Sequence, residues 1–231
     1  NGTFKASDAI GHLAIGPLTL DNAEFDYSGL SGYSDKLGVM PFSGRVSFKG
    51  DNPYHILQTG FGTDSKTTAK KFCLWSDPKS EFYVDDITGD NAEDVVIGAM
   101  LADHCKQTAY TNKEDPSKNR ELVMAPGGLI KIGPGTLSLT NQLNTFSGDI
   151  EVREGTLQAG PNWQLNASTL ADTEAKATDH WLGCLTNENR KIIVKKGALL
   201  YFPNRNCFGT QGGITNLMPG VNVTFVFDGG V

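Results

Sequence analysis

The chain of 231 residues has no apolar run that approaches the roughly 18 to 20 residues of a membrane-spanning helix. Its first residues, Asn1-Gly2-Thr3-Phe4, lack the basic region and the apolar stretch of a secretory signal peptide, and there is no initiator Met. We therefore interpret the chain as a processed or excised piece of a longer protein.

Charge is sparse, and basic charge is the scarcer kind. Lys and Arg number 20 against 26 Asp and Glu, which gives a net charge of −6, and only 20% of the residues are charged. Domains that bind nucleic acid usually show a basic patch or stripe. This composition therefore argues against a nucleic-acid partner.

The common catalytic and metal-binding motifs are missing as well. There is no HExxH, no G-x-S-x-G and no C-x-x-C. Asp103-His104-Cys105 places a thiol next to an imidazole, but neighbouring residues on one element point in different directions, so a nucleophilic pair is not predicted there. We expect no enzyme activity, no catalytic residue, no metal and no cofactor.

The cysteines number four, at positions 73, 105, 184 and 207. An even number suits two disulfides in a protein of an oxidising compartment. Their order in the sequence favours Cys73–Cys105 and Cys184–Cys207, although four cysteines allow three pairings and the sequence does not choose among them. Four buried thiols are the alternative.

The residues that are present favour short strands. Gly is frequent, at 27 residues, and apolar and polar residues alternate in many short segments, as in Leu137-Ser138-Leu139. This period of two is typical of strands with one buried face. The clearest predicted strands are 12–20, 23–27, 45–48, 129–132, 136–139, 150–152, 156–158, 192–194, 198–202 and 223–227.

Similar turns open several of these strands. Gly135-Thr136-Leu137 and Gly155-Thr156-Leu157 are one such pair, and Gly197-Ala198-Leu199 follows at about twice their interval. A spacing of roughly 20 residues suits one coil of a repeat protein. The sequence thus predicts a single all-β unit over 1–231 whose strands recur coil by coil.

Two segments interrupt the pattern. We interpret 59–121 as an irregular insertion that includes one short helix, which Asp90 or Asn91 would cap, although Gly98 and the β-branched residues after Asp94 disfavour a helix. The second, 161–190, is predicted to be an inserted loop. Each segment holds at least one cysteine, as expected if disulfides stabilise the insertions.

Residues 127–160 carry a resemblance to a known family. They include Asn144-Thr145-Phe146-Ser147-Gly148 and then Gly155-Thr156-Leu157-Gln158-Ala159-Gly160. This stretch resembles the autotransporter-associated β-strand repeat, also called the passenger-associated transport repeat. The resemblance implies a right-handed parallel β-helix with inserted loops, in a secreted or cell-surface protein of a Gram-negative bacterium.

In such a solenoid each coil stacks its apolar residues on the coil below, and turn positions need special residues. Glycine suits turns with positive φ, and asparagine can hydrogen-bond backbone groups in a turn. The predicted turn positions are Gly135, Asn144, Gly148, Gly155 and Gly160. The strand-like C-terminal residues are expected to continue into further coils of a parent chain.

The densest group of carboxylates lies in the first insertion, at Asp85, Asp86, Asp90, Glu93 and Asp94. Parallel β-helix enzymes that act on polysaccharides use grouped carboxylates, sometimes with calcium. These five follow one another along a single segment, however, which a solvated loop and a helix N-terminus explain better.

We therefore expect a structural stalk or an adhesin from an autotransporter passenger. Trp163 and Trp181 are the candidate ligand contacts, for a host glycan or a surface protein, because exposed aromatic rings stack on sugars and anchor partner proteins. Their burial would instead favour sealing of the inserted loop. The competing hypotheses are a polysaccharide lyase or hydrolase and an inert spacer.

Overall fold

The computed structural model describes residues 2–5, 16–26, 40–42, 44–56, 71–107, 122–141, 144–160, 181–185, 188–203 and 223–229. Every regular element in these ranges is a β-strand, and the strands are numbered β1 to β18. The same ranges contain no helix long and apolar enough to cross a membrane.

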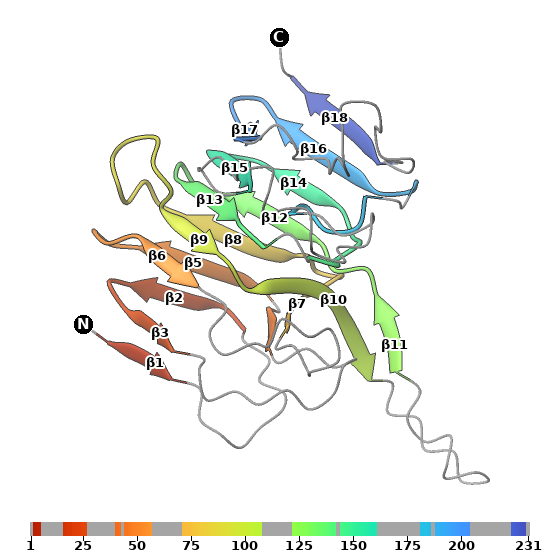
Figure 1. Ribbon diagram of the computed structural model, residues 1–231, viewed down its shortest axis with the longest axis horizontal. Coiled ribbons are helices and arrows are strands. Elements are labelled where there is room, and N and C mark those ends of the chain that lie inside the picture. Colours follow the sequence, from red (N-terminus) through yellow and green to blue (C-terminus); the bar gives the residue numbers. More distant parts are fainter. Residues whose placement is uncertain are drawn as a thin grey trace, which may run out of the picture.

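The largest sheet has seven strands, and all of its neighbouring strands are parallel (Figure 1). In spatial order they are β2 (Leu18–Asp21), β5 (Arg45–Lys49), β8 (Ser80–Val84), β12 (Leu129–Ile132), β14 (Ile150–Val152), β16 (Lys191–Lys195) and β18 (Thr224–Asp228). Spatial order therefore follows chain order.

A second parallel sheet contains β6 (Tyr54–Ile56), β9 (Val95–Ile97), β13 (Thr136–Leu139), β15 (Thr156–Ala159) and β17 (Leu199–Tyr201), also in chain order. The chain alternates between the two sheets, from β8 to β9, from β12 to β13 and from β14 to β15. Each pass of the chain thus lies on the previous one, which is consistent with a β-helix-like fold.

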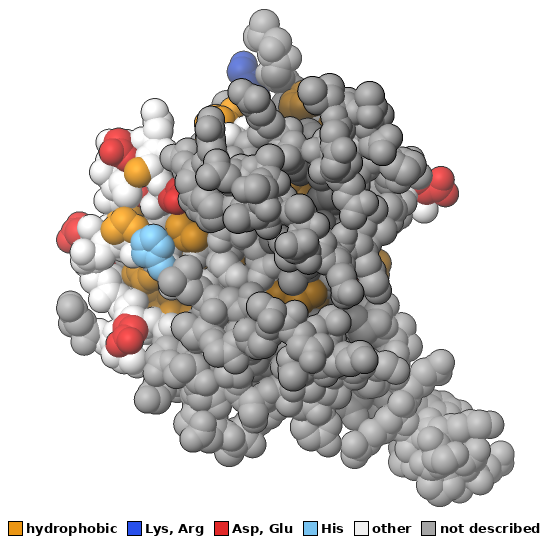
Figure 2. All heavy atoms as spheres, in the orientation of Figure 1, with side chains coloured by type: hydrophobic (Ala, Val, Ile, Leu, Met, Phe, Trp, Pro, Cys, Tyr) orange, Lys and Arg blue, Asp and Glu red, His pale blue; other side chains and the backbone are white. Residues whose placement is uncertain are grey.

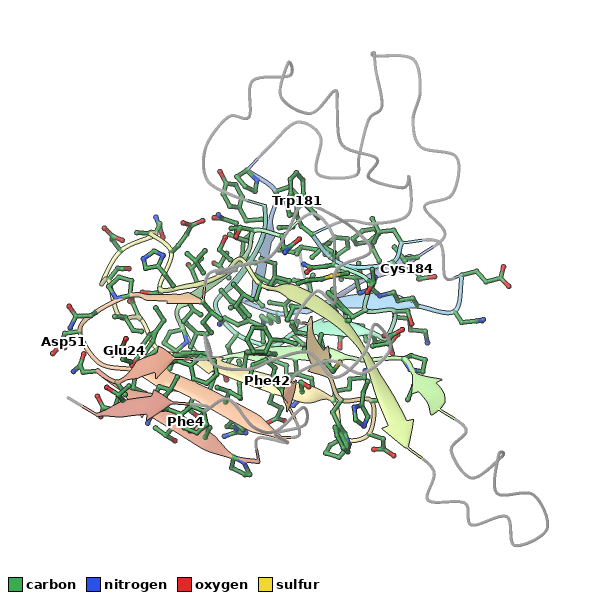
Figure 3. All side chains as sticks on the ribbon, turned by 60° about the horizontal axis from the view of Figure 1, so that its bottom comes forward. Phe4, Glu24, Phe42, Asp51, Trp181 and Cys184 are labelled. Atoms are coloured by element: carbon green, nitrogen blue, oxygen red, sulfur yellow. The ribbon has the colours of Figure 1, made fainter. Side chains whose placement is uncertain are left out.

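A third sheet has three parallel strands from successive passes and a fourth strand that is antiparallel. Its parallel strands are β4 (Met40–Phe42), β7 (Lys71–Leu74) and β10 (Met100–Gln107), and β11 (Leu122–Ala125) pairs antiparallel with β10. Figure 1 shows β10 and β11 together at one side of the stack. At the N-terminal end, β1 (Thr3–Lys5) and β3 (Glu24–Asp26) form a small parallel sheet, on which Phe4 and Glu24 are labelled in Figure 3.

The core lies between the sheets and consists of columns of apolar side chains. Leu129, Ile150 and Ile192 are paired across β12, β14 and β16, and each is fully buried. Leu137 and Leu157 form a similar column across β13 and β15. Because inward residues alternate with outward ones along each strand, the period-two pattern of the sequence becomes a continuous apolar interior.

The strand predictions agree closely with the structure. The strands 129–132, 136–139 and 150–152 have the predicted bounds, and the others differ by a residue or two where the structure describes them. The fold is all-β with parallel sheets, as predicted.

The helix expected near Asp90 is not present, because Val95–Ile97 forms the strand β9 instead. This run of β-branched residues is fully or almost fully buried between β6 and β13, and such residues favour strands over helices. The range 59–121, interpreted as irregular, contains β7 to β10, which belong to the same sheets as their neighbours, while 57–70 and 108–121 lie outside the described residues.

Candidate functional site

The segment from β12 to β15, residues Leu129 to Ala159, makes two successive passes that are stacked directly on each other. Leu129 pairs with Ile150, and Thr136 pairs with Thr156. The predicted turn positions lie in or directly after this segment, and Trp181 contacts it.

The predicted turn glycines allow close approach between passes. Gly155 has φ of 62°, and a Cβ on it would lie 2.5 Å from the carbonyl oxygens of Gly133, Pro134 and Gly135. Gly160 has φ of 105° and lies against the ring of Trp181.

At Gly135 and Gly148 the reason for glycine is space, because φ is not positive there. A Cβ on Gly148 would lie 2.5 Å from the carbonyl oxygen of Gly127, and one on Gly135 would collide with the carbonyl oxygen of Asp85. The sequence therefore located four positions that need glycine, but two of them need it for close packing and not for backbone conformation.

Asn144, the fifth predicted turn position, is fully buried and joins three passes of the chain. Its Oδ1 accepts a hydrogen bond from the Leu101 amide at 2.8 Å, and its Nδ2 donates to the Trp181 carbonyl at 2.7 Å. Its amide therefore supplies partners to two buried backbone groups on two different passes.

Asp103 likewise joins separate passes of the chain through hydrogen bonds of its side chain. Its Oδ1 accepts hydrogen bonds from the amides of Gly127 and Ser147, both at 2.7 Å, and its Oδ2 accepts one from the Ser147 hydroxyl at 2.7 Å. Asp103 thus fastens β10 to the repeat. Sequence reasoning considered Asp103 only as the neighbour of His104, because its partners lie far away in the chain.

His104 and Trp75 stack on each other, with ring centroids 3.8 Å apart and an angle of 26° between the rings. Both side chains are half-buried. The stack joins β10 to the residue after β7.

The carboxylates of the predicted acidic group do not form one site, because those that are hydrogen-bonded accept from different donors. Asp94 is fully buried, and its Oδ1 accepts from the amides of Ile87 and Thr88 and from the Thr88 hydroxyl, at 2.7 to 2.9 Å. Its Oδ2 accepts from the Thr136 amide at 2.6 Å on the next pass. Asp94 therefore organises its own loop and anchors it to the repeat.

Three other carboxylates of the group accept hydrogen bonds from separate donors. Asp86 accepts from the Gly89 amide, Asp90 from the Ala92 amide, and Glu93 from the Ser138 hydroxyl. On the face of the molecule drawn in Figure 2, the coloured Asp and Glu side chains do not form one continuous patch. Among the described residues no group of three or more His, Cys, Asp or Glu side chains could hold a metal ion.

Two basic residues are fully buried, which the sequence did not predict. The Nζ of Lys131 donates to the carbonyl oxygens of Ile132, Gly133 and Glu154 at 3.1, 2.7 and 3.1 Å, and burial lowers the pKa of Lys131 to about 8 against the opposing effect of Asp94 and Glu154.

The guanidinium of Arg190 donates to the carbonyl oxygens of Gly148, Cys184 and Leu182 at 2.5 to 2.7 Å, and it lies 4.8 Å from the centre of the Phe146 ring. Burial lowers the pKa of Arg190 to about 10. Its carbonyl partners come from two different passes, so Arg190 connects the residues before β16 to the repeat.

Trp181, one of the two candidate ligand contacts, is labelled in Figure 3. It is 5% exposed and belongs to the hydrophobic core. Its ring covers Gly160, and its carbonyl accepts from Asn144. Trp163 lies outside the described residues.

The disulfide prediction is not confirmed. No disulfide joins the two cysteines whose side chains are described, Cys73 and Cys184. The proposed partners, Cys105 and Cys207, have side chains outside that part of the structure. In backbone register Cys73 lies opposite Ala102, three residues before Cys105.

Comparison with known families gives one result. Residues 129–159 match the model of the Passenger-associated-transport-repeat. The chain carries a passenger-associated transport repeat. This repeat coincides with the two stacked passes from β12 to β15, and it suggests that the chain is an autotransporter passenger region, a class of secreted or cell-surface protein of Gram-negative bacteria. No curated protein and no solved structure matches the chain.

Proposed function

We propose that the chain is a non-enzymatic stalk segment of an autotransporter passenger, built as a right-handed parallel β-helix and displayed on or released from a Gram-negative cell. The observation that carries the proposal is the unbroken parallel register of the large sheet from β2 to β18. A stack in which each pass contacts only its neighbours extends in one direction, which suits a spacer between a cell and its surroundings.

The hydrogen bonding of the carboxylates supports a structural role. Asp94 and Asp103 accept bonds from backbone amides on two passes, and Glu93 bonds to Ser138 and Gln158. A polysaccharide lyase or hydrolase would need carboxylates or basic groups that converge on a groove with room for substrate. Carboxylates engaged by their own backbone are poorly placed for that chemistry.

Adhesion is the second candidate, and it draws support from the outer face of β17. Leu199 and Tyr201 point outward because Leu200 between them follows the inner column of Leu157, and they are 53% and 43% exposed. Exposed aromatic and aliphatic side chains suit contact with a host glycan or a surface protein. The burial of Trp181 argues against that residue as a ligand contact.

A neighbouring coil from the same parent chain is the remaining proposed partner. Phe227 lies in register with Val194, which is an inward residue of β16, yet Phe227 is 68% exposed. An inner-column phenylalanine that is left uncovered supports stacking of a further coil on β18.

One experiment separates these functions. The purified chain is incubated with a panel of host glycans, mucins and plant polysaccharides, and both retention and the release of reducing ends or unsaturated products are measured. We expect neither product nor retention for a stalk. Retention that the double variant Leu199→Ser, Tyr201→Ser abolishes would establish adhesion, whereas formation of product would overturn the proposal. Asp228→Asn, a surface change beside neither residue in register, is the matched control for retention.

A further inference from the structure

Lys131 lies at a strand position that apolar side chains occupy on the adjacent strands. It pairs in register with Phe82 on one side and Val152 on the other, and both are fully buried inward residues of β8 and β14. The same column continues to Val46 and Val194, which are also buried. One strand of the stack therefore directs an ammonium group into the interior where the others direct hydrocarbon.

The ammonium lies among carbonyl oxygens of two successive turns. Ile132 is the last residue of β12 and Gly133 the first of the turn that follows it, whereas Glu154 belongs to the equivalent turn after β14, one pass further on. The carbonyl oxygens of Gly133, Pro134 and Gly135 all face Gly155, so the first turn presents a group of acceptors to the second.

A second bond joins the same two turns, because the Gly133 amide donates to Glu154 Oε2 at 3.1 Å. Lys131 and Glu154 therefore have complementary roles where the two turns meet: Lys131 donates to carbonyl oxygens, and the Glu154 side chain accepts from an amide. Asp94, whose carboxylate accepts from the Thr136 amide, is the other charged group near Lys131.

Arg190 repeats the arrangement elsewhere in the stack. It is 1% exposed, and each of its three hydrogen bonds goes to a backbone carbonyl oxygen, with Gly148 on one pass and Leu182 and Cys184 on another. Two buried cations thus hold carbonyl oxygens of different passes together, although one is a lysine within a strand and the other an arginine just before one.

We propose that Lys131 is an internal cation that sets the register of two successive turns, 133–135 and 153–155, by binding the carbonyl oxygens of both. A shift of one residue would turn the apolar residues outward, but a shift of two would keep them in the interior, so the apolar columns alone do little to exclude a two-residue shift. A buried polar group that finds its partners in only one register supplies that distinction.

The test is hydrogen exchange measured by mass spectrometry on peptides that cover 132–136 and 153–156. In Lys131→Met, which keeps most of the volume but has no N–H donor, we expect exchange in both peptides to become about tenfold faster or more, as loss of a charged hydrogen-bond donor implies. Lys191→Met is the matched control, because that lysine is exposed and lies on β16 of the same sheet, which β14 separates from β12. Exchange in Lys131→Met that equals the control would overturn the proposal, since volume alone would then suffice.

Chemical rescue gives an independent readout, which also works if a variant fails to fold. Lys131→Ala leaves space for a small cation, so ethylammonium should restore slow exchange, or the β-sheet circular dichroism of an unfolded variant. Tetramethylammonium, which has the charge but no N–H group, should not. Equal effects of the two ions, or no effect of either, would contradict the role of the ammonium donors.

Discussion

Asp94 shows how a single buried carboxylate can organise a loop that carries many charges. Four donors converge on its two oxygens, and three of them are backbone amides from Ile87, Thr88 and Thr136. Without the carboxylate the buried Thr136 amide and the partly buried amides of Ile87 and Thr88 would lose their acceptor, and a buried group left unsatisfied costs about 1 to 3 kcal/mol. The position of Thr136 in the repeat therefore depends on a residue outside it.

Replacing Asp94 by alanine should lower the free energy of unfolding by about 3 kcal/mol, because one buried donor and three partly buried donors lose their acceptor together. Urea denaturation measures the change. Asp90→Ala is the matched control, since Asp90 is exposed and bonds only to the Ala92 amide nearby, and it should cost about 1 kcal/mol or less. Equal costs for the two variants would show that the burial of Asp94 has no special importance.

Lys131 makes stability depend on pH in the alkaline range. Its pKa is about 8 in the folded chain, whereas an exposed lysine has a value near 10.5. Between these values the unfolded chain holds more protons than the folded chain, so the free energy of unfolding rises with pH from about 8 towards 10.5. Below pH 8 both states are protonated and this contribution is constant.

The measurement is urea denaturation of the natural chain and of Lys131→Met at pH 7.5 and 9.5. The natural chain should gain stability relative to the variant over this interval, because only the natural chain has a lysine that deprotonates first when folded. Tyr54, whose pKa burial raises, contributes equally to both proteins. A difference between the proteins that stays constant with pH would contradict a lowered pKa for Lys131.

At the scale of single residues the sequence predicted turn glycines well and buried polar residues poorly. Gly155 and Gly160 have the positive φ expected of them. Lys131, Arg190 and Asp103, in contrast, bind partners that are remote in the chain, and nothing in their local sequence separates them from surface residues. Periodicity reports which face a residue occupies, but not which turn of another pass will lie against it.

The elements of this fold are short, and the strands were therefore predictable where alternation was clean. Exceptions include β8, which alternates between buried and partly buried residues but lies in the range interpreted as irregular, and the residues after Asp90, which were expected to form a helix. Asp and Asn before an apolar run suggest a helix cap, but the run itself is Val95-Val96-Ile97, and stacking between β6 and β13 buries all three residues as a strand. Stacking against the neighbouring strands favoured a strand here, and Asp and Asn are as common in turns as at the N-termini of helices.

Two glycines at equivalent turns allow the close stacking of successive turns to be tested. Gly155 and Gly197 both precede the strand of the second sheet, with φ of 62° and 80°. A Cβ on Gly155 would meet three carbonyl oxygens at 2.5 Å, whereas one on Gly197 would meet nothing within 4 Å. The two positions thus share the backbone strain and differ in the contact with a preceding turn.

Gly197→Ala should cost about 1 to 2 kcal/mol, which is the strain of a left-handed conformation alone. Gly155→Ala should cost clearly more, because the turn 133–135 must also move away. Thermal and urea denaturation of both variants give the comparison. Similar costs would mean that successive turns are less closely stacked than the structure indicates.

For the whole molecule, the outer face of the large sheet carries a row of ion pairs. Arg45 bonds to Glu81, Arg153 to Glu151, and Lys195 to Asp228, at 2.6 to 2.9 Å. These side chains are partly exposed, and pairs of this kind contribute only about 0 to 1 kcal/mol each. The inner columns, which exclude water completely over several passes, therefore dominate the stability of the stack.

A stack stabilised by its inner columns should respond differently to the same truncation at different positions. Leu137 and Leu200 belong to one column, which runs from Tyr54 through Val95, Leu137 and Leu157 to Leu200. Leu137 is fully buried with neighbours on both sides, whereas Leu200 is only partly buried at the last strand of its sheet. Leu137→Ala should cost about 3 kcal/mol, as expected for a buried leucine with little room to relax.

Leu200→Ala should cost about 1 kcal/mol, because part of its surface already contacts water. Hydrogen exchange provides the spatial readout, since in a one-dimensional stack a defect affects its immediate neighbours first. Leu137→Ala should accelerate exchange in both β9 and β15, whereas Leu200→Ala should affect β15 and β17 and leave β9 protected. Acceleration throughout the chain in both variants would mean that the passes unfold as one cooperative unit, and the coil-by-coil description of this molecule would then be wrong.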